Sequence, residues 1–143
     1  MKVVLLIVRL LFGGVFIWSG IAKLKDPISF ADSVRNFQMV GDPIAPVLAL
    51  LIPSIEIVAG TAVMAALGLR GGTGILVSSL IIFTTAIAIA WARGLDISCG
   101  CFGGTGEINY PLKISQNLLL LAMGMVLWKW GKKHEEGTTP RKA

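Results

Sequence analysis

The sequence predicts an all-α integral membrane protein, built as a four-helix bundle with a short interfacial helix between spans one and two. Composition is the first reason: hydrophobic residues make up 55% of the chain, charged residues 15%, and the mean hydropathy is +0.78. Soluble domains carry about 25% charged residues, so too few are present here to cover a surface in water. The second reason is that four apolar stretches reach the roughly 17–25 residues that cross a bilayer as helix.

The four stretches cover residues 3–24, 46–69, 72–92 and 112–130. We expect them to form one membrane domain over residues 1–130, followed by a disordered cytoplasmic tail over residues 131–143, because that tail is polar. The first stretch is too long for a cleaved signal peptide and is expected to remain as an anchor. The two residues between stretches two and three, Arg70 and Gly71, predict a tight hairpin there.

Residues 26–38 predict the short amphipathic helix. Asp26 followed by Pro27 is the order of an N-cap and a first helical residue. Ile28, Ala31 and Val34 then recur at helical spacing, with charged residues around the rest of the circumference. We expect this helix to lie in the outer interface, where it could cover the bundle or serve as a plain connector.

The distribution of basic residues predicts the orientation and argues against a nucleic-acid partner, although the net charge is +5 and the pI is 9.6. Four spans place both termini on one side, which also holds the larger share of Lys and Arg, so the positive-inside rule places both termini in the cytoplasm. That side carries Lys2, Arg70, Lys129, Lys132, Lys133, Arg141 and Lys142; the other carries Lys23, Lys25, Arg35, Arg93 and Lys113. The expected location is the bacterial cytoplasmic (inner) membrane.

Small and polar residues at helical spacing predict the face that each span turns inward, because small residues let helices approach closely in lipid. The predicted inner faces are Arg9, Gly13, Phe16, Gly20 and Lys23 in span one, Pro53, Glu56 and Gly60 in span two, Gly74, Ser78 and Thr85 in span three, and Lys113, Asn117 and Gly124 in span four.

The candidate reactive residues are Cys99 and Cys101, the only two cysteines, which lie between spans three and four. Gly100 between them permits the bend that a disulfide across two positions requires. Such a ring closes a tiny loop and is strained, so it suits thiol exchange better than stabilisation. Arg93 and Lys23 could favour a thiolate nearby. Idle thiols and a structural bridge remain alternatives, and no metal site is expected because zinc needs three or four ligands.

Two charged residues lie within predicted spans, and such residues are functional hypotheses by default. Glu56 is near the middle of span two, and Arg9 lies near the cytoplasmic end of span one. They could form a pair. Alternatively, Arg9 reaches the membrane surface while Glu56 is neutral and hydrogen-bonded. A protonatable Glu56 could serve proton transfer if the protein reduces a quinone.

Several of these segments resemble a known family. The run from Arg9 through Trp18-Ser-Gly20 to Lys23-Leu-Lys-Asp26-Pro27 resembles the opening of DoxX-like membrane proteins. The segments Pro53-Ser-Ile-Glu56-Ile-Val-Ala-Gly60 and Cys99-Gly-Cys-Phe-Gly103 are similar to the MauE branch of these proteins. The resemblance implies a four-helix membrane protein linked to extracytoplasmic disulfide chemistry with thioredoxin-like partners, and it allows a quinone as cofactor.

Together these features predict a membrane thiol–disulfide relay protein that uses Cys99 and Cys101. Its expected partner is an extracytoplasmic thioredoxin-like protein or a maturing exported protein. Two alternatives stay open: a non-catalytic subunit that anchors or assembles an electron-transfer complex, and a small carrier of a soft metal or sulfur compound. Whether the chain is itself an oxidoreductase is left open by the residues.

Overall fold

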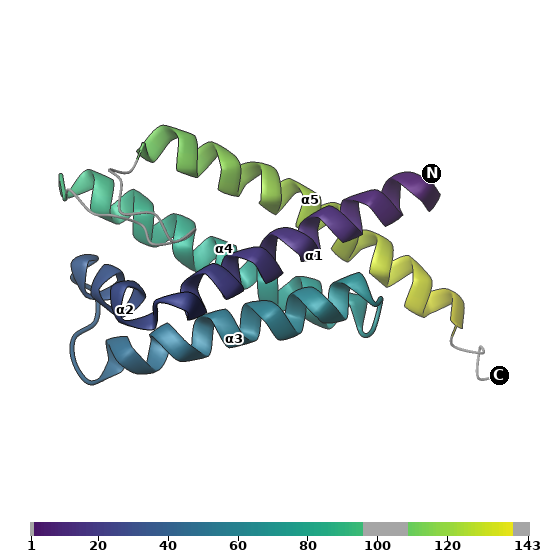
Figure 1. Cartoon of the computed structure of the whole chain (residues 1–143). Coiled ribbons are helices and arrows are strands. Elements are labelled where there is room, and N and C mark those ends of the chain that lie inside the picture. Colours follow the sequence, from purple (N-terminus) through teal and green to yellow (C-terminus); the bar gives the residue numbers. More distant parts are fainter. Residues whose placement is uncertain (1, 96–108, 139–143) are drawn as a thin grey trace.

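The computed structural model describes residues 2–95 and 109–138, with side chains as far as residue 133. These residues form five helices: α1 (Lys2–Lys25), α2 (Pro27–Asn36), α3 (Ile44–Met64), α4 (Leu69–Ala92) and α5 (Tyr110–Thr138) (Figure 1). The predicted all-α fold is confirmed for the described part of the chain, with α2 as the short helix between the first two spans.

Four of the helices, α1, α3, α4 and α5, are long and apolar enough to cross a membrane. Their outward faces carry large apolar side chains, among them Trp18, Val58 and Ile82, which are 70%, 70% and 69% exposed. In water such surfaces would aggregate, whereas lipid tails solvate them as well as a protein interior does. The chain is therefore a multi-pass membrane protein.

The tightest helix contact joins α1 to α3, and glycine makes it possible. A methyl group added to Gly13 would lie 2.7 Å from the carbonyl oxygen of Gly60, and one added to Gly20 would lie 2.8 Å from that of Pro53. Backbone therefore touches backbone along the stripe predicted for spans one and two. The buried face of α1 contains Gly13, Phe16, Gly20 and Lys23 of that stripe, and Arg9 is only half-buried.

The helices close around one main apolar core. α1 packs on α3 and α4 on α5, while contacts of α3 with α4 and of α1 with α5 complete the bundle. The core consists of Phe12, Phe16, Ala59, Val63, Leu69, Leu76, Leu80 and Leu127. The start of α1 and the end of α5 lie at the end of the bundle opposite α2 (Figure 1).

The start of α2 is confirmed as predicted. The Asp26 carboxylate accepts a hydrogen bond from the backbone N–H of Ser29 at 3.0 Å, and Pro27 is the first helical residue. This bond to the ionised form lowers the pKa of Asp26. The predicted inward face is confirmed at Ala31, which is 5% exposed, but not at Ile28, which is 74% exposed while Phe30 is 2% exposed. The larger Phe30 ring faces the bundle, and Ile28 faces outward.

The hairpin between α3 and α4 lies earlier than predicted, at residues 65–68. Ala66 and Gly68 both have φ of +59°, and the N–H of Leu67 donates to the carbonyl of Ala62 at 2.9 Å, which ends α3. Arg70 belongs to the first turn of α4, where its guanidinium lies 5.7 Å from the centre of the Trp128 ring. A second difference concerns the tail: α5 continues to Thr138, into the segment expected to be disordered.

The inner face predicted for α4 is also wrong in part. Ser78 and Thr85 are exposed, and each hydroxyl donates to a carbonyl one turn earlier in its own helix, at 2.8 and 2.7 Å. Satisfied within the helix, such hydroxyls can face lipid. On α5 the prediction succeeds better, because Gly124 is buried and Asn117 donates to Thr84 of α4 at 3.1 Å.

Candidate functional site

The described residues on either side of the cysteine-containing segment lie at the same end of the bundle as α2. Helix α4 ends at Ala92, and Gly94, with φ of +66°, turns the chain away from the helix. The N–H groups of Gly94 and Leu95 donate to the carbonyls of Trp91 and Ala90 at 3.0 and 3.1 Å. This pair of bonds is a Schellman cap, so the point at which the segment leaves the bundle is fixed.

The point of return is fastened to the point of departure. The Tyr110 hydroxyl, in the first turn of α5, donates a hydrogen bond to the carbonyl of Leu95. The Tyr110 ring also stacks on Trp91 of α4, with centroids 6.1 Å apart and planes 7° apart. We call Trp91, Leu95 and Tyr110 the neck. The neck joins the two ends of the 96–108 segment.

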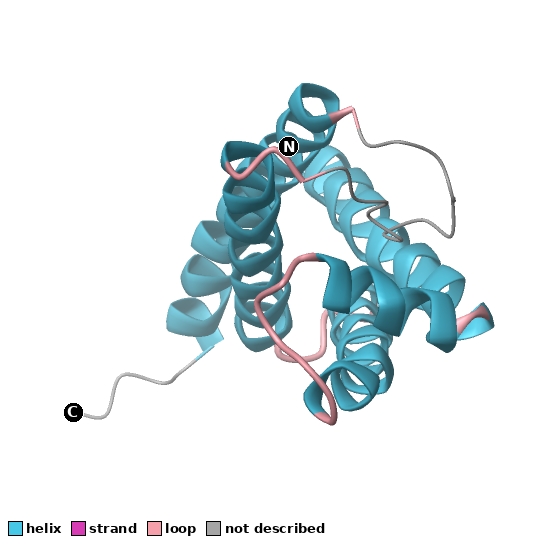
Figure 2. Ribbon diagram, turned by 90° about the vertical axis from the view of Figure 1, so that its left-hand side faces the viewer, coloured by secondary structure: helices cyan, strands magenta, loops and turns pink. Residues whose placement is uncertain are grey.

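Helix α2 lies against this neck. Its C-cap residue Phe37 forms a buried cluster with Ile87 and Ala90 of α4, and Leu95 and Tyr110 pack against that cluster. Figure 2 shows α2 running across the bundle at this end. Of the two roles considered for this helix, the contacts favour the one in which it covers the bundle end beside the cysteine-containing segment.

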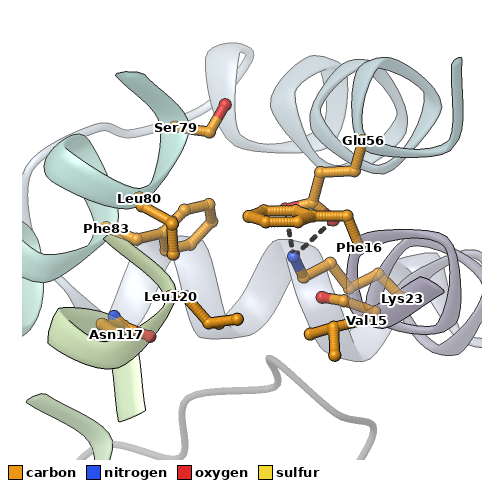
Figure 3. A pocket seen from close by; sticks show the side chains of 10 residues that line it. Val15, Phe16, Lys23, Glu56, Ser79, Leu80, Phe83, Asn117 and Leu120 are labelled. Atoms are coloured by element: carbon orange, nitrogen blue, oxygen red, sulfur yellow. Dashed lines mark hydrogen bonds and ion pairs between the residues drawn. The ribbon is translucent and has the colours of Figure 1, made fainter. Parts of the chain in front are cut away.

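A second polar feature lies inside the bundle. The Lys23 ammonium of α1 donates to both carboxylate oxygens of Glu56 on α3, at 2.7 and 2.8 Å (Figure 3). Both side chains are 3% exposed. The Ser19 hydroxyl, one turn before Lys23, also hydrogen-bonds to the Glu56 carboxylate. A buried charge in a membrane must be paired in this way, because the lipid offers it no solvation.

Two aromatic rings cover the ammonium. Phe83 of α4 has its ring centre 4.9 Å from the Lys23 nitrogen, and Phe30 of α2 has its own at 5.3 Å. Both distances lie within the roughly 6 Å of a cation–π contact. Lys23 therefore contacts α2, α3 and α4 at one point. We call Lys23, Glu56, Ser19, Phe30 and Phe83 the buried charge cluster.

A cavity of about 50 Å³ adjoins this cluster. Side chains from α1, α3, α4 and α5 line it, including the polar Ser19, Lys23, Glu56, Ser79 and Asn117 and the apolar Phe16, Leu80 and Leu120 (Figure 3). Since a buried water needs about 10–15 Å³ in this measure, the cavity has room for about three to five waters.

The comparisons with known proteins identify the family. A family model described as methylamine utilisation protein MauE matches residues 1–130. The chain belongs to the MauE family. A methylamine utilization protein MauE of Paracoccus denitrificans is 31% identical over 127 residues, which are 87% of this chain and 68% of that protein. Its counterpart in Paracoccus versutus is 27% identical over 120 residues, 82% of this chain and 64% of that protein. No solved structure matches the chain significantly.

In this member of the MauE family, the candidate site residues fall into separate places. Cys99, Gly100 and Cys101 lie outside the described residues. Arg93 is the exposed C-cap residue of α4, two positions before the neck residue Leu95. Lys23, expected to favour a thiolate nearby, is buried and paired with Glu56. The wider DoxX-like resemblance stays a prediction from the sequence.

The Arg9–Glu56 pair is wrong, because Lys23 occupies the carboxylate. Arg9 precedes Lys23 by 14 residues, about 21 Å along a helix. Its Nε is buried without a hydrogen-bond partner in the described part of the chain. The other reading of Glu56, as a neutral hydrogen-bonded group, holds for its hydrogen bonds, because both carboxylate oxygens lie within hydrogen-bonding distance of the Lys23 nitrogen.

Sequence reasoning missed Ser19, Phe30, Phe83 and Tyr110. Ser19 could have been found, since it precedes Lys23 by four residues and therefore shares its helix face. Phe30 and Phe83 gave no such signal, because apolar side chains in apolar helices are usually core or lipid-facing. Tyr110 is the only tyrosine of the chain and begins α5, but its partner is a backbone carbonyl that no residue type reveals.

The cavity does not fit a quinone. A void of about 150 Å³ accommodates a benzene ring, and this one is a third of that size. We therefore assign no quinone step to it. Among the side chains of residues 2–95 and 109–133, no three His, Cys, Asp or Glu gather where a metal could bind.

Proposed function

We propose that this chain is a membrane thiol–disulfide relay protein that acts in methylamine utilisation. Cys99 and Cys101 exchange a disulfide with an extracytoplasmic thioredoxin-like protein or with a maturing exported protein. The observation that carries the proposal is the neck, which ties both ends of the cysteine-containing segment to one end of the bundle. The process comes from the names of the Paracoccus relatives.

The partner protein supplies the second pair of sulfurs that the redox reaction requires. A thiolate of one protein attacks the disulfide of the other, which forms a mixed disulfide and releases the second sulfur as a thiolate. The remaining thiol of the attacking pair then displaces the partner. One dithiol is oxidised, one disulfide is reduced, and the two protons given up by the first are taken up by the second.

The neck supports this chemistry by limiting where the thiols can go. Cys99 follows Leu95 by four residues, so their α-carbons are at most about 14 Å apart. Chain connectivity therefore keeps the thiols near the bundle end covered by α2. The basic side chain of Arg93 lies at the same end, exposed, where a positive charge favours a thiolate.

We further propose that the chain lies in the bacterial cytoplasmic membrane with both termini in the cytoplasm and Cys99 and Cys101 outside. The excess of Lys and Arg on the side of the termini supports this orientation. Disulfides persist outside the cytoplasm, so the orientation and the relay chemistry agree.

One observation favours the second candidate, a non-catalytic subunit that anchors or assembles an electron-transfer complex. The buried charge cluster is internally satisfied, since Lys23 and Ser19 both hydrogen-bond to Glu56. A cluster of this kind shapes a protein without reacting. The two functions differ in what they require of the thiols.

Single cysteine variants test the relay. Cys99→Ser or Cys101→Ser removes the resolving thiol, so we expect one of them to accumulate a mixed disulfide with its partner on a non-reducing gel. We also expect the wild-type disulfide to titrate reversibly above about −300 mV, the upper bound typical of structural bridges.

The control is the double variant Cys99→Ser/Cys101→Ser, which should form no adduct. An anchoring subunit predicts the opposite pattern, in which neither single variant forms an adduct and methylamine-dependent growth is normal in all three. That pattern would exclude the relay.

A further inference from the structure

The buried charge cluster connects more helices than an ion pair needs to. Glu56 of α3 neutralises Lys23 of α1, and that alone would satisfy the charge. Yet Phe30 of α2 and Phe83 of α4 also lie over the same ammonium. One nitrogen atom thus contacts the only short helix of the described chain and two of its spans.

The polar groups of the cluster have partners within the bundle. Two of the three ammonium protons have carboxylate acceptors, and the third faces aromatic rings. The carboxylate also accepts from Ser19. Removing two charges from water costs several kcal/mol per ion, which the pair recovers only through such geometry. A membrane protein gains little net stability from a pair of this kind, which favours a positioning role for it.

Helix α2 links the cluster to the neck. Phe30 and Phe37 are seven residues apart, which places them on one face of the helix about 10 Å from each other along its axis. Phe30 rests on Lys23. Phe37 belongs to the cluster of Ile87 and Ala90 against which Leu95 and Tyr110 pack. One face of α2 and its C-cap therefore contact the buried charge through Phe30 and, through Phe37, share the cluster against which Leu95 and Tyr110 pack.

We propose that Lys23 is a positioning residue: its ammonium, fixed by Glu56, holds Phe30 and thereby sets where α2 packs against Leu95 and Tyr110, between which the thiols are tethered. The functional effect of this positioning on the thiols rests on the proposed thiol chemistry. The placement of α2 by Lys23 does not, and it can be measured separately.

The first measurement is the position of α2. Spin labels are attached at Ile28→Cys on α2 and Leu112→Cys on α5, both exposed sites, in a Cys99→Ser/Cys101→Ser background. Double electron–electron resonance on the purified full chain in detergent then reports the distance between α2 and the start of α5. We expect Lys23→Met and Phe30→Leu each to broaden and shift this distance distribution.

The second measurement concerns the thiols. In the chain with both native cysteines reduced, we expect Lys23→Met and Phe30→Leu to change the rate of modification by a water-soluble maleimide at least threefold. Arg9→Met is the matched control, because it removes one positive charge from the same helix at the end far from α2. It should leave the distance and the rate within experimental error.

Each outcome decides the proposal. Unchanged distances in folded Lys23→Met and Phe30→Leu overturn it, as does an equal change in Arg9→Met. A shifted distance with unchanged maleimide rates shows that α2 does not position the thiols, and this also overturns it. If Lys23→Met fails to fold, Lys23→Met/Glu56→Gln, which leaves no unpaired charge, and Phe30→Leu carry the test. Failure of the mixed-disulfide trap in single cysteine variants would remove the relay and leave these distances unaffected.

Discussion

Lys23 shows how a single residue is fixed by its surroundings. A lysine two positions before the end of a spanning helix ordinarily extends its stem toward the membrane surface and leaves its charge in water. Here the carboxylate of Glu56 and the two rings of Phe30 and Phe83 provide a replacement for water inside the bundle. The side chain therefore turns inward, whereas Lys25, the last residue of the helix, is exposed.

A double-mutant cycle measures how much the contact between Lys23 and Glu56 contributes to the free energy of unfolding. We expect Lys23→Met and Glu56→Gln each to lower the free energy of unfolding by about 3–5 kcal/mol, because each leaves the other partner buried and uncompensated. The loss of unfolding free energy in the double variant should be about 1–3 kcal/mol smaller than the sum of the two single losses. Reversible unfolding in detergent, followed by circular dichroism, gives the four values.

The exposed pair of Arg35 with Asp42 on the bundle end supplies the control cycle. Its nitrogen and oxygen are 2.7 Å apart, as in the buried pair, but water surrounds both groups. Arg35→Gln and Asp42→Asn should show a much smaller coupling. Strictly additive losses for Lys23 and Glu56 would mean that the buried contact contributes nothing to stability.

At the scale of the helix, close packing of α1 on α3 depends on where glycine occurs. Gly13 and Gly14 are neighbours in sequence but differ in surroundings. A methyl group on Gly13 would lie 2.6 Å from Met64 and 2.7 Å from the backbone oxygen of Gly60, whereas one on Gly14 meets nothing within 4 Å. The first position is a helix contact and the second faces open space.

These neighbours give a matched pair of substitutions. Gly13→Ala should destabilise the bundle by about 1–3 kcal/mol, because the backbone of α3 cannot yield as a side chain would. Gly14→Ala should be neutral or stabilise by up to about 1 kcal/mol through the higher helix propensity of alanine. Thermal unfolding of the two variants side by side checks the difference. Equal effects would show that α1 and α3 are farther apart than described.

Sequence patterns predicted the elements better than the contacts between them. The small-residue stripes placed Lys23, Gly20, Glu56 and Gly60 on inward faces of their helices, and the structure confirms all four as buried. Which cation meets Glu56 depends on the relative rotation and depth of α1 and α3. Residue spacing within one helix carries no information on either. The stripe of α4 failed for a different reason, since serine and threonine can satisfy themselves within their own helix.

For the molecule as a whole, the four spans of the described residues place both of their ends on one side of the membrane. Only two orientations then remain, with that side either inside or outside the cell. The start of α1 and the end of α5 lie opposite α2, so the neck faces the other side of the membrane from both (Figure 1). We expect a membrane-impermeant maleimide to label Cys99 or Cys101 in intact spheroplasts after mild reduction. Mass-tag shifts on a gel measure the extent of labelling.

A reciprocal variant controls for leakage. Leu67, 70% exposed in the α3–α4 turn, lies at the end of the bundle that carries the termini. Leu67→Cys in a Cys99→Ser/Cys101→Ser background should react only after lysis. The reverse pattern, with Leu67→Cys labelled in intact cells and the native cysteines protected, would invert the topology and place the thiols in a reducing compartment.

The neck has a consequence for chain length. Because Tyr110 and Trp91 hold the two ends of the 96–108 segment together, the bundle does not depend on that segment to keep α4 beside α5. Doubling the length of such a closed loop costs only about 0.6 kcal/mol. We therefore expect the thirteen residues from 96 to 108 to be replaceable without loss of the helix bundle. Peptides of other lengths and thiol spacings can be inserted there, while the membrane domain serves as a constant frame.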